Sequence, residues 1–327
     1  MKHFFVINPH SFIATEGYQN VIAEIESCFV DGNSDDFRIH ISRYTRDAIA
    51  VVHDYISSYS TDELVRIYAI GGDGILFECL NGMVDFPNAE LTSIPYGNAN
   101  DFVRAFGEDA YHHFRDIKNL LCAPSRPVDI IHCGSNYALN GVNIGLVGQT
   151  IIEAFKVFPH LSAKWLRKNI SFAYTLCALK GLVNKALTSQ YYTATVDGRD
   201  YSGKYCNIYI ANHSCIGGDM TPSPYAIPND GKLNVIFAKS LGTLSLAQKL
   251  GEYNKGKFEK FDFLFHSECN TMEIKSDRML CVEMDGEGFY AHELVVKIIP
   301  NGVRVFAPQG LDFVDYSYKA YRKSRLK

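Results

Sequence analysis

The sequence predicts an α/β plus all-β protein, in which a parallel α/β domain is followed by a domain of antiparallel strands. Three observations support this prediction. The chain has 327 residues, enough for about two domains of ordinary size. Up to about residue 129, short β-branched or aromatic runs alternate with segments of helical periodicity, as a parallel α/β domain requires. After that point, short strand-like runs are separated by Gly, Asn, Asp and Pro, which is typical of antiparallel sheets.

The first domain is predicted to have the element order β-α-β-α-β-α-β. The strands are expected at residues 3–7, 37–41, 64–70 and 91–94, and the helices around residues 21–29, 48–56 and 76–83. In each helix, apolar residues recur at helical spacing and so form one face. Residues 64–70 are almost uninterruptedly apolar, as expected of a strand buried on both faces of a parallel sheet.

The second domain is predicted to contain strands at residues 191–196, 205–211, 233–237 and 294–299. One helical segment is expected over residues 162–186, with an interruption near Gly181. The change in residue pattern places the two domains at residues 1–129 and 130–305. Residues 306–327 are expected to form a C-terminal segment that packs back on the first domain.

The composition argues against several classes of protein. The 32 basic and 36 acidic residues give a net charge of −4, so we expect no nucleic-acid partner, which normally requires a basic face. The nine cysteines include no Cys-x-x-Cys pair, which fits reduced thiols in a cytosol. The N-terminal apolar run is too short for a signal peptide, and no run reaches the roughly 18 residues of a membrane span. We therefore expect a cytoplasmic protein.

The first functional signal is Gly71-Gly72-Asp73-Gly74, between a predicted buried strand and a predicted helix. Glycines let backbone N–H groups approach an anion, and a helix N-terminus carries partial positive charge, so this position suits a phosphate. Asp73 would repel a bare phosphate and is better explained as a ligand of a magnesium-bound phosphate or as a base. The alternative is a tight turn with Asp73 as the helix N-cap. The pattern is neither a Walker loop nor the G-x-G-x-x-G signature.

A second signal lies at residues 95–102, again at the end of a predicted strand. Open parallel sheets bind ligands outside the carboxyl ends of their strands, so both loops can contact one nucleotide. Asn98, Asn100 and Asp101 would supply polar contacts to it. The alternative is an Asn/Asp-rich turn that caps the following helix.

A third signal is Met284-Asp285-Gly286-Glu287-Gly288, where two carboxylates flank a glycine between strand-like segments. Phosphoryl transfer needs a carboxylate that accepts a hydroxyl proton, and this segment offers two candidates. The alternative is an ordinary Asp-Gly hairpin turn.

Taken in this order, the motifs resemble those of the diacylglycerol kinase catalytic family, which includes bacterial lipid kinases and sphingosine kinases. The matching segments are residues 5–9, residues 71–74 with Glu78 and Asn81-Gly82 behind them, residues 95–102, Asn212 with Gly217-Gly218 and Pro222, residues 229–233, and residues 285–287. They extend from residue 4 to about residue 290, and the ordered set is far more specific than any one motif.

The resemblance implies a Rossmann-like parallel α/β nucleotide-binding domain and an antiparallel β-sandwich domain, as in NAD kinases and diacylglycerol kinases, with the active site in the cleft between them. It also implies transfer of the γ-phosphate of ATP to the hydroxyl of a diacylglycerol-like lipid, with Mg²⁺ as cofactor. Such an enzyme would belong to lipid metabolism and phospholipid biosynthesis.

The resemblance further implies a role for each matching residue. The nucleotide-binding residues would be Asn8, Thr45, Gly71, Gly72, Asp73, Gly74, Asn98, Asn100 and Asp101. The catalytic residues would be Glu287 as proton acceptor, Asp285 beside it, and Asp73. The metal-associated residues would be Asp101 and Asp129 in the catalytic magnesium network, and Asp230 and Lys232 at a structural magnesium site.

The chain departs from the family pattern at three places. Ile75 stands where the family usually has Thr or Ser, Asn98 follows Gly97 where it usually has Thr, and residues 145–148 weaken a Gly-Phe-Asp-Ala element. These departures favour one alternative, a catalytically weakened regulator that binds nucleotide or lipid. The other alternative is an NAD kinase-like enzyme, whose similar fold also uses Gly-Gly-Asp-Gly.

The C-terminal tail is basic and aromatic. Its basic residues, interleaved with tyrosines, are Lys319, Arg322, Lys323, Arg325 and Lys327. Each basic residue near an anionic bilayer can contribute up to about 1 kcal/mol, which would help a kinase reach a membrane-resident lipid. The alternative is a solvated terminal helix. The expected partners are ATP, a lipid alcohol and, transiently, the inner membrane surface, with a homodimer left open.

Overall fold

The computed structural model describes residues 1–12, 15–29, 36–107, 109–157, 189–218, 220–240 and 262–316. Internal contacts distinguish two compact units, one of residues 1–130 and 300–314 and one of residues 131–299 and 315–327. The chain leaves the first unit within β5 (Ser125–Cys133) and returns within β14 (Glu287–Phe306). Compact units need not coincide with domains, so the domain limits at residues 129 and 305 stay predictions. The predicted helix at residues 162–186 and the basic tail from Lys319 lie outside the described residues.

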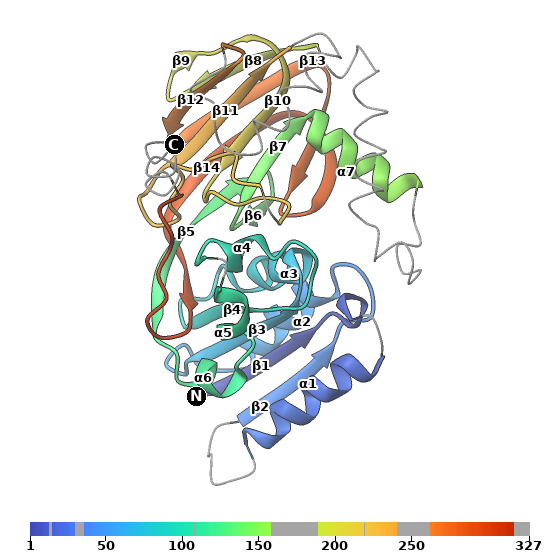
Figure 1. Cartoon of the computed structure of the whole chain (residues 1–327), viewed down its shortest axis with the longest axis vertical. Helices are drawn as coiled ribbons and strands as arrows, with labels where there is room; N and C mark the ends of the chain where they lie inside the picture. The colour runs from blue at the N-terminus through green and yellow to red at the C-terminus, as the bar shows by residue number, and fades with distance from the viewer. Residues whose placement is uncertain are drawn as a thin grey trace, which may run out of the picture. The chain divides into compact units, whose positions relative to one another are not determined.

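The first unit is built on a parallel sheet with the strand order β2-β1-β3-β4 (Figure 1). These strands are β1 (Lys2–Ile7), β2 (Asp36–Ile41), β3 (Val65–Gly71) and β4 (Ala89–Pro95). The far end of β14 extends the sheet in parallel with β4, where Arg304 pairs with Glu90 and Val305 with Leu91. Each predicted strand of this region is confirmed to within two residues at either end.

Helices connect these strands. They are α1 (Thr15–Ser27) after the short 3-10 turn η1 (Pro9–Ser11), α2 (Asp47–Ser57), α3 (Asp73–Met83), and, after β4, α4 (Asp101–Arg104), α5 (Ala110–His113) and α6 (Ile117–Leu121). Because the chain crosses the sheet one way from β1 to β2 and the other way from β2 to β4, right-handed crossovers put α1 on one face and α2 and α3 on the other. Gly82 lets α2 and α3 pack closely, since a Cβ there would lie 2.6 Å from the Ile49 carbonyl oxygen.

Aromatic side chains fill the core on both faces of β1. Adjacent residues of a strand point to opposite faces, and Phe4 and Phe5 are both fully buried. Phe4 stacks on Tyr55 of α2 with ring centroids 4.1 Å apart, and Phe5 stacks on Tyr68 of β3 at 4.2 Å. The sheet therefore has an apolar layer on each face, as expected of parallel strands that are covered on both sides.

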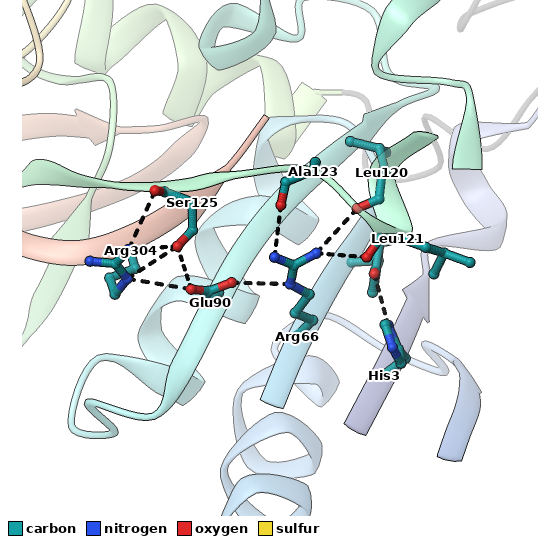
Figure 2. Close-up of polar contacts among 9 residues, drawn as sticks. His3, Arg66, Glu90, Leu120, Leu121, Ala123, Ser125 and Arg304 are labelled. Atoms are coloured by element: carbon teal, nitrogen blue, oxygen red, sulfur yellow. Dashed lines mark hydrogen bonds and ion pairs between the residues drawn. The ribbon is translucent and has the colours of Figure 1, made fainter. Parts of the chain in front are cut away.

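A buried ion cluster joins this sheet to the strands that enter and leave the unit (Figure 2). Arg66 of β3 donates to the Glu90 carboxylate of β4 at 3.0 Å and to the Ala123 carbonyl oxygen at 2.8 Å. On the other side of Glu90, Arg304 donates at 3.3 Å, and the Ser125 hydroxyl donates as well. Arg66 and Glu90 are 6% and 5% exposed. Because losing one partner would leave a buried charge uncompensated, the cluster holds β14 in place beside β4.

The second unit consists mainly of antiparallel strands. In addition to parts of β5 and β14, they are β6 (Asn136–Ala138), β7 (Gly141–Gly145), β8 (Gln190–Val196), β9 (Arg199–Asp200), β10 (Gly203–Ala211), β11 (Leu233–Lys239), β12 (Leu264–Cys269) and β13 (Thr271–Met284). Their order is β12-β11-β10-β7-β13-β14. Both β7 and β8 pair with β10 and with β13, so these four strands form a closed ring of pairings.

The antiparallel pairings agree with the β-rich second domain that the sequence predicts. The helix α7 (Leu146–Val157) follows β7 and packs against β13. Within the described ranges, no helix combines the length and the apolar character that crossing a membrane requires.

Candidate active site

The loops that follow β1, β3 and β4 meet at the carboxyl edge of the parallel sheet. Asn8 follows β1, and its backbone N–H donates to the carbonyl oxygen of Ile70 in β3 at 2.9 Å. The Gly71 carbonyl oxygen accepts the backbone N–H groups of Tyr96 and Gly97, at 2.7 and 2.9 Å. These contacts bring together three segments that the sequence predicts to bind nucleotide.

Glycine residues let two of these loops touch directly. A Cβ on Gly97 would lie 2.2 Å from the Cα of Gly72, so the two loops pack backbone to backbone. A Cβ on Gly71 would lie 2.9 Å from both the Ser11 hydroxyl and the Ile75 side chain. Ile75 itself is 2% exposed. The apolar residue that stands in place of the family's Thr or Ser therefore fills the space behind the glycine loop.

Asp73 links the first glycine loop to the start of α4. Gly72 is the N-cap of α3, and Asp73 is the first residue of that helix. Its Oδ1 accepts the backbone N–H of Asp101, the first residue of α4, at 2.8 Å. The interpretation of Asp73 as the N-cap of its own helix is therefore wrong, because its carboxylate holds a neighbouring helix instead. Two acidic residues lie at one sheet edge, which fits a magnesium ion held by one or two carboxylates and by substrate phosphates.

Asn100 shapes the loop after β4. Its φ is 52°, and its side-chain amide donates to the Gly97 carbonyl oxygen at 2.8 Å and accepts the Gly97 N–H at 3.0 Å. Asn98, in contrast, is exposed. Both asparagines line a half-open pocket of about 350 Å³, together with Arg104 and His112. A pocket lined by these four residues thus lies directly beside the predicted nucleotide loop.

Arg115, which carries no sequence signal of its own, fixes the end of β4. Its Nε donates to the Pro95 carbonyl oxygen at 2.8 Å. Its guanidinium lies 4.1 Å from the ring centroid of Tyr96 and 4.2 Å from that of Tyr111. Tyr96 packs in turn against Phe12, with ring centroids 4.5 Å apart. Arg115 therefore helps to set the direction in which the loop after β4 leaves the sheet.

Glu78, the acid that follows the glycine loop in the motif, caps α2. Its two carboxylate oxygens accept the backbone N–H groups of Arg46 at 2.9 Å and Ala48 at 3.0 Å. Negative charge is favourable at a helix N-terminus, where the backbone N–H groups lack intrahelical partners. These hydrogen bonds fix the loop before α2, which carries the exposed Thr45. The motif glutamate is therefore part of the structure that supports a predicted nucleotide-binding residue.

In the second unit, Asp285 and Gly286 form the two-residue turn of the β13–β14 hairpin. Their φ values are 47° and 93°, and Met284 pairs with Glu287 across the turn. Two positive φ values are typical of the type I′ turn, which favours Asp-Gly. The interpretation of this segment as a hairpin turn is confirmed. Glu287 is the first residue of β14 and is half-buried.

The Asp285 carboxylate is hydrogen-bonded to backbone N–H groups. It is 6% exposed and accepts the N–H groups of Leu139, Asn140 and Gly141 at 2.7, 3.0 and 3.0 Å. Burial raises the pKa of Asp285 to about 7, and the backbone hydrogen bonds lower it by less. A pKa near 7 suits a general base, but a base must also reach the substrate proton. The geometry therefore favours an anchoring role for Asp285.

The other predicted metal-associated residues each have hydrogen-bond partners in their own unit. Asp129 in β5 is 2% exposed and accepts the backbone N–H of Asn301 at 2.8 Å. Asp230 is exposed and accepts the Lys232 N–H at 3.0 Å, and the Lys232 ammonium donates to Glu268 at 2.7 Å. In the part of the chain that the structure describes, no three His, Cys, Asp or Glu side chains gather to hold a metal ion. A magnesium site built from these described residues would need phosphate, carbonyl or water oxygens as well.

Comparison with known families gives two matches. A family model described as "Diacylglycerol kinase catalytic domain" matches residues 2–133. A second, described as "YegS C-terminal NAD kinase beta sandwich-like domain", matches residues 160–307. The two matches follow each other along the chain in the order that the sequence motifs predict.

Individual relatives agree with these matches. The chain is 26% identical over 260 residues to a Shewanella frigidimarina protein named "Probable lipid kinase YegS-like", and the match covers 78% of this chain and 80% of the relative. Its fold is similar to that in a crystal structure of a diacylglycerol kinase from Bacillus anthracis, with a TM-score of 0.68 and 18% identity. That likeness covers 95% of this chain and 98% of the other, and it shows the fold.

Proposed function

Because the chain belongs to the diacylglycerol kinase catalytic-domain family, we propose that it is an ATP-dependent lipid kinase. It would transfer the γ-phosphate of ATP to the hydroxyl of a diacylglycerol-like or related lipid. The observation that carries the proposal is the meeting of three strand-end loops around Asp73 and Asp101. Open parallel sheets bind their ligands at such an edge.

The first unit would serve as a Rossmann-like nucleotide-binding domain. The backbone of residues 71–74, at the N-terminus of α3, would bind phosphate, and Asn8, Thr45 and Asn98 would contact the nucleotide. Asp73 and Asp101 would hold a magnesium ion, which supplies charge neutralisation at the γ-phosphate when bound. Asn100 would act mainly by keeping Gly97 in position against Gly72.

Glu287 would accept the proton of the lipid hydroxyl as that hydroxyl attacks the γ-phosphate. Three backbone N–H groups occupy the carboxylate of Asp285, whereas Glu287 is half-buried at the end of the hairpin. Asp73 is also less suited, because its Oδ1 holds the backbone of Asp101. Asp285 would contribute by anchoring the hairpin turn to residues 139–141.

The proposed substrate, a lipid alcohol, indicates where in the cell the enzyme would act. A lipid alcohol lies in a bilayer, so the enzyme would work from the cytoplasm in transient contact with the inner membrane surface. Its product would be a phosphorylated lipid of the kind used in phospholipid biosynthesis. Asp129 would belong to the catalytic magnesium network, and Asp230 and Lys232 to a separate structural magnesium site.

The test is γ-phosphate transfer from labelled ATP, with Mg²⁺, to a panel of lipid alcohols in mixed micelles beside NAD. We expect a labelled lipid from the wild-type protein. Glu287→Gln and Asp73→Asn, which keep the size of the side chain, should each lower kcat by at least about a hundredfold. Glu273→Gln, on an exposed position of β13, is the matched control and should leave kcat unchanged.

The other possible results of this transfer assay distinguish the alternative functions. Labelled NAD in place of lipid would identify an NAD kinase-like enzyme. Full activity in a folded Glu287→Gln variant would remove that residue from the mechanism. Binding of ATP without any labelled product over the whole panel would favour the nucleotide-binding regulator.

A further inference from the structure

A second buried acid, Glu283, contacts the turn that directly precedes Glu287. Glu283 belongs to β13 and is 6% exposed. Its Oε1 accepts the backbone N–H of Gly286, the second residue of the turn, at 2.7 Å. Its Oε2 accepts the side-chain amide of Asn143 on β7, also at 2.7 Å. A buried carboxylate is tolerated where such donors replace the lost water, and here one donor comes from the turn itself.

The contact with Asn143 ends a longer chain of buried hydrogen bonds. The Oδ1 of Asn143 accepts from the Nδ2 of Asn207 on β10 at 3.2 Å. The Oδ1 of Asn207 accepts the backbone N–H of Val147, in the first turn of α7, at 3.1 Å. Asn143 and Asn207 are 1% and 5% exposed. Every donor in this chain points toward Glu283, so the carboxylate terminates a row of aligned dipoles that starts at a helix N-terminus.

The helix α7 also touches the hairpin directly. A Cβ on Gly148 would lie 2.3 Å from the Cys281 carbonyl oxygen of β13. A Cβ on Gly288, the neighbour of Glu287 in β14, would lie 2.8 Å from the Ile152 side chain. The helix therefore packs against both strands of the hairpin, close to the residues that flank its turn.

We propose that Glu283 is a positioning residue for Glu287, and that the hydrogen-bond chain through Asn143 and Asn207 fixes the turn relative to α7. The inference rests on the proposed role of Glu287 as the base. Asp285 anchors the first turn residue through its own carboxylate, and Glu283 anchors the second through the Gly286 N–H. Together the two buried acids determine where the next side chain points. A displacement of about 1 Å in a reacting group can cost on the order of a hundredfold in rate.

The donor and acceptor pattern provides a sharp test. In Glu283→Gln, the new amide group must face either the Gly286 N–H or the Asn143 amide, and both are donors. Rotating the side-chain amides of Asn143 and then of Asn207 by half a turn does not remove the clash between two donors. It only moves that clash to the Val147 N–H, which would then face the Asn207 amide NH₂. In Asn143→Asp, two carboxylates face each other. The double variant Glu283→Gln/Asn143→Asp removes both conflicts, because the introduced glutamine amide donates to the introduced carboxylate while its oxygen still accepts from Gly286.

The experiment measures kcat and the KM for ATP of the two single variants and the double variant, with thermal unfolding of each. We expect each single variant to lower kcat at least tenfold while the KM for ATP changes less than about twofold. The double variant should recover kcat to within about threefold of wild type. Glu273→Gln on the same strand is the matched control. Asn207→Asp places a carboxylate oxygen opposite the Oδ1 of Asn143 and so breaks the chain one step away from Glu283.

The outcomes separate this inference from the proposed function. No transfer by the wild-type protein would overturn the function itself. Wild-type transfer with unchanged kcat in a folded Glu283→Gln or Asn207→Asp variant would overturn the positioning role. A loss of kcat that the double variant does not recover, although it is as stable as wild type, would also overturn it. If Glu283→Gln does not fold, the positioning role is tested by the kcat of Asn207→Asp, which should fall, and by the kcat of the double variant, which should be close to that of wild type.

Discussion

The loops at the edge of the parallel sheet and the β13–β14 hairpin hold their acids in opposite ways. In the loops, glycine backbones touch, and Gly97 has no space for a side chain against Gly72. In the hairpin, the buried carboxylates of Asp285 in the turn and of Glu283 in β13 accept hydrogen bonds from backbone and side-chain donors at residues 139–143. The contact between the loops depends on the absence of side chains at Gly72 and Gly97, and the hairpin turn depends on buried carboxylate oxygens that accept hydrogen bonds.

This difference predicts opposite sensitivities. The fold of the loops should tolerate a new side chain at a position with open space around it. It should not tolerate an added methyl group where Gly72 and Gly97 touch. The hairpin should tolerate a small change of volume, but it should respond to the protonation of its buried acids and to the loss of their hydrogen-bond acceptors. The following substitutions test this contrast, in order of decreasing effect.

Asp285→Asn should change the pH dependence of stability most. Because burial raises the folded-state pKa of Asp285 from 3.8 to about 7, the folded protein keeps a proton that the unfolded chain has released between these values. The stabilisation is therefore fully present below pH 4 and is lost as the pH rises through about 7, by on the order of 4 kcal/mol. The introduced asparagine cannot ionise, so this loss should disappear in the variant. Urea unfolding of both proteins between pH 4 and 8 measures the free energy of unfolding at each pH. Parallel curves of this free energy against pH for the two proteins would contradict the prediction.

Gly97→Ala should damage the loops by steric overlap alone. Its methyl group would lie 2.2 Å from the Gly72 Cα, and the two backbones would have to separate. We expect a loss of about 3 kcal/mol in the free energy of unfolding and much weaker ATP binding. Gly74→Ala is the control for stability, because its Cβ would meet nothing within 4 Å. Equal stability of the two variants would show that the loops can separate without cost.

Arg115→Met should weaken the loop after β4 without adding volume. It removes the hydrogen bond to Pro95 and the stacking on Tyr96 and Tyr111, for an expected loss of about 2 kcal/mol. The KM for ATP should rise while kcat changes little. Arg115→Lys keeps the charge but not the planar guanidinium, so it should rescue only part of the loss. Complete rescue by Lys would indicate that charge alone matters here.

Glu78→Gln should have the smallest effect of the four. The amide keeps one acceptor for the α2 N-terminus but loses the second oxygen and the negative charge, which predicts a loss of about 1 kcal/mol. Thermal unfolding beside Glu26→Gln, on an exposed position of α1, measures the difference. A larger loss than that of Gly97→Ala would mean that the loops also depend mainly on charge.

The same contrast explains which parts were predictable from the sequence. Strands β1, β3 and β4 are short, largely apolar runs, and β2 alternates apolar and polar residues. The glycine loop follows β3 immediately, so the local pattern was enough. Strand β14 was predicted only at residues 294–299, because its first part carries exposed residues of mixed type. Glu283 and Arg115 gave no signal, because their roles depend on partners that only the folded chain brings near.

Strand β14 has a consequence for how the chain is made. Residues 300–306, which complete the parallel sheet beside β4, leave the ribosome long after residues 1–130. Until they arrive, Glu90 has no contact with Arg304, and β4 presents an open edge of unpaired backbone groups to other chains. We therefore expect residues 1–130 to reach their stable form only after residues 300–306 have been synthesised, and to depend on chaperones while that edge is open.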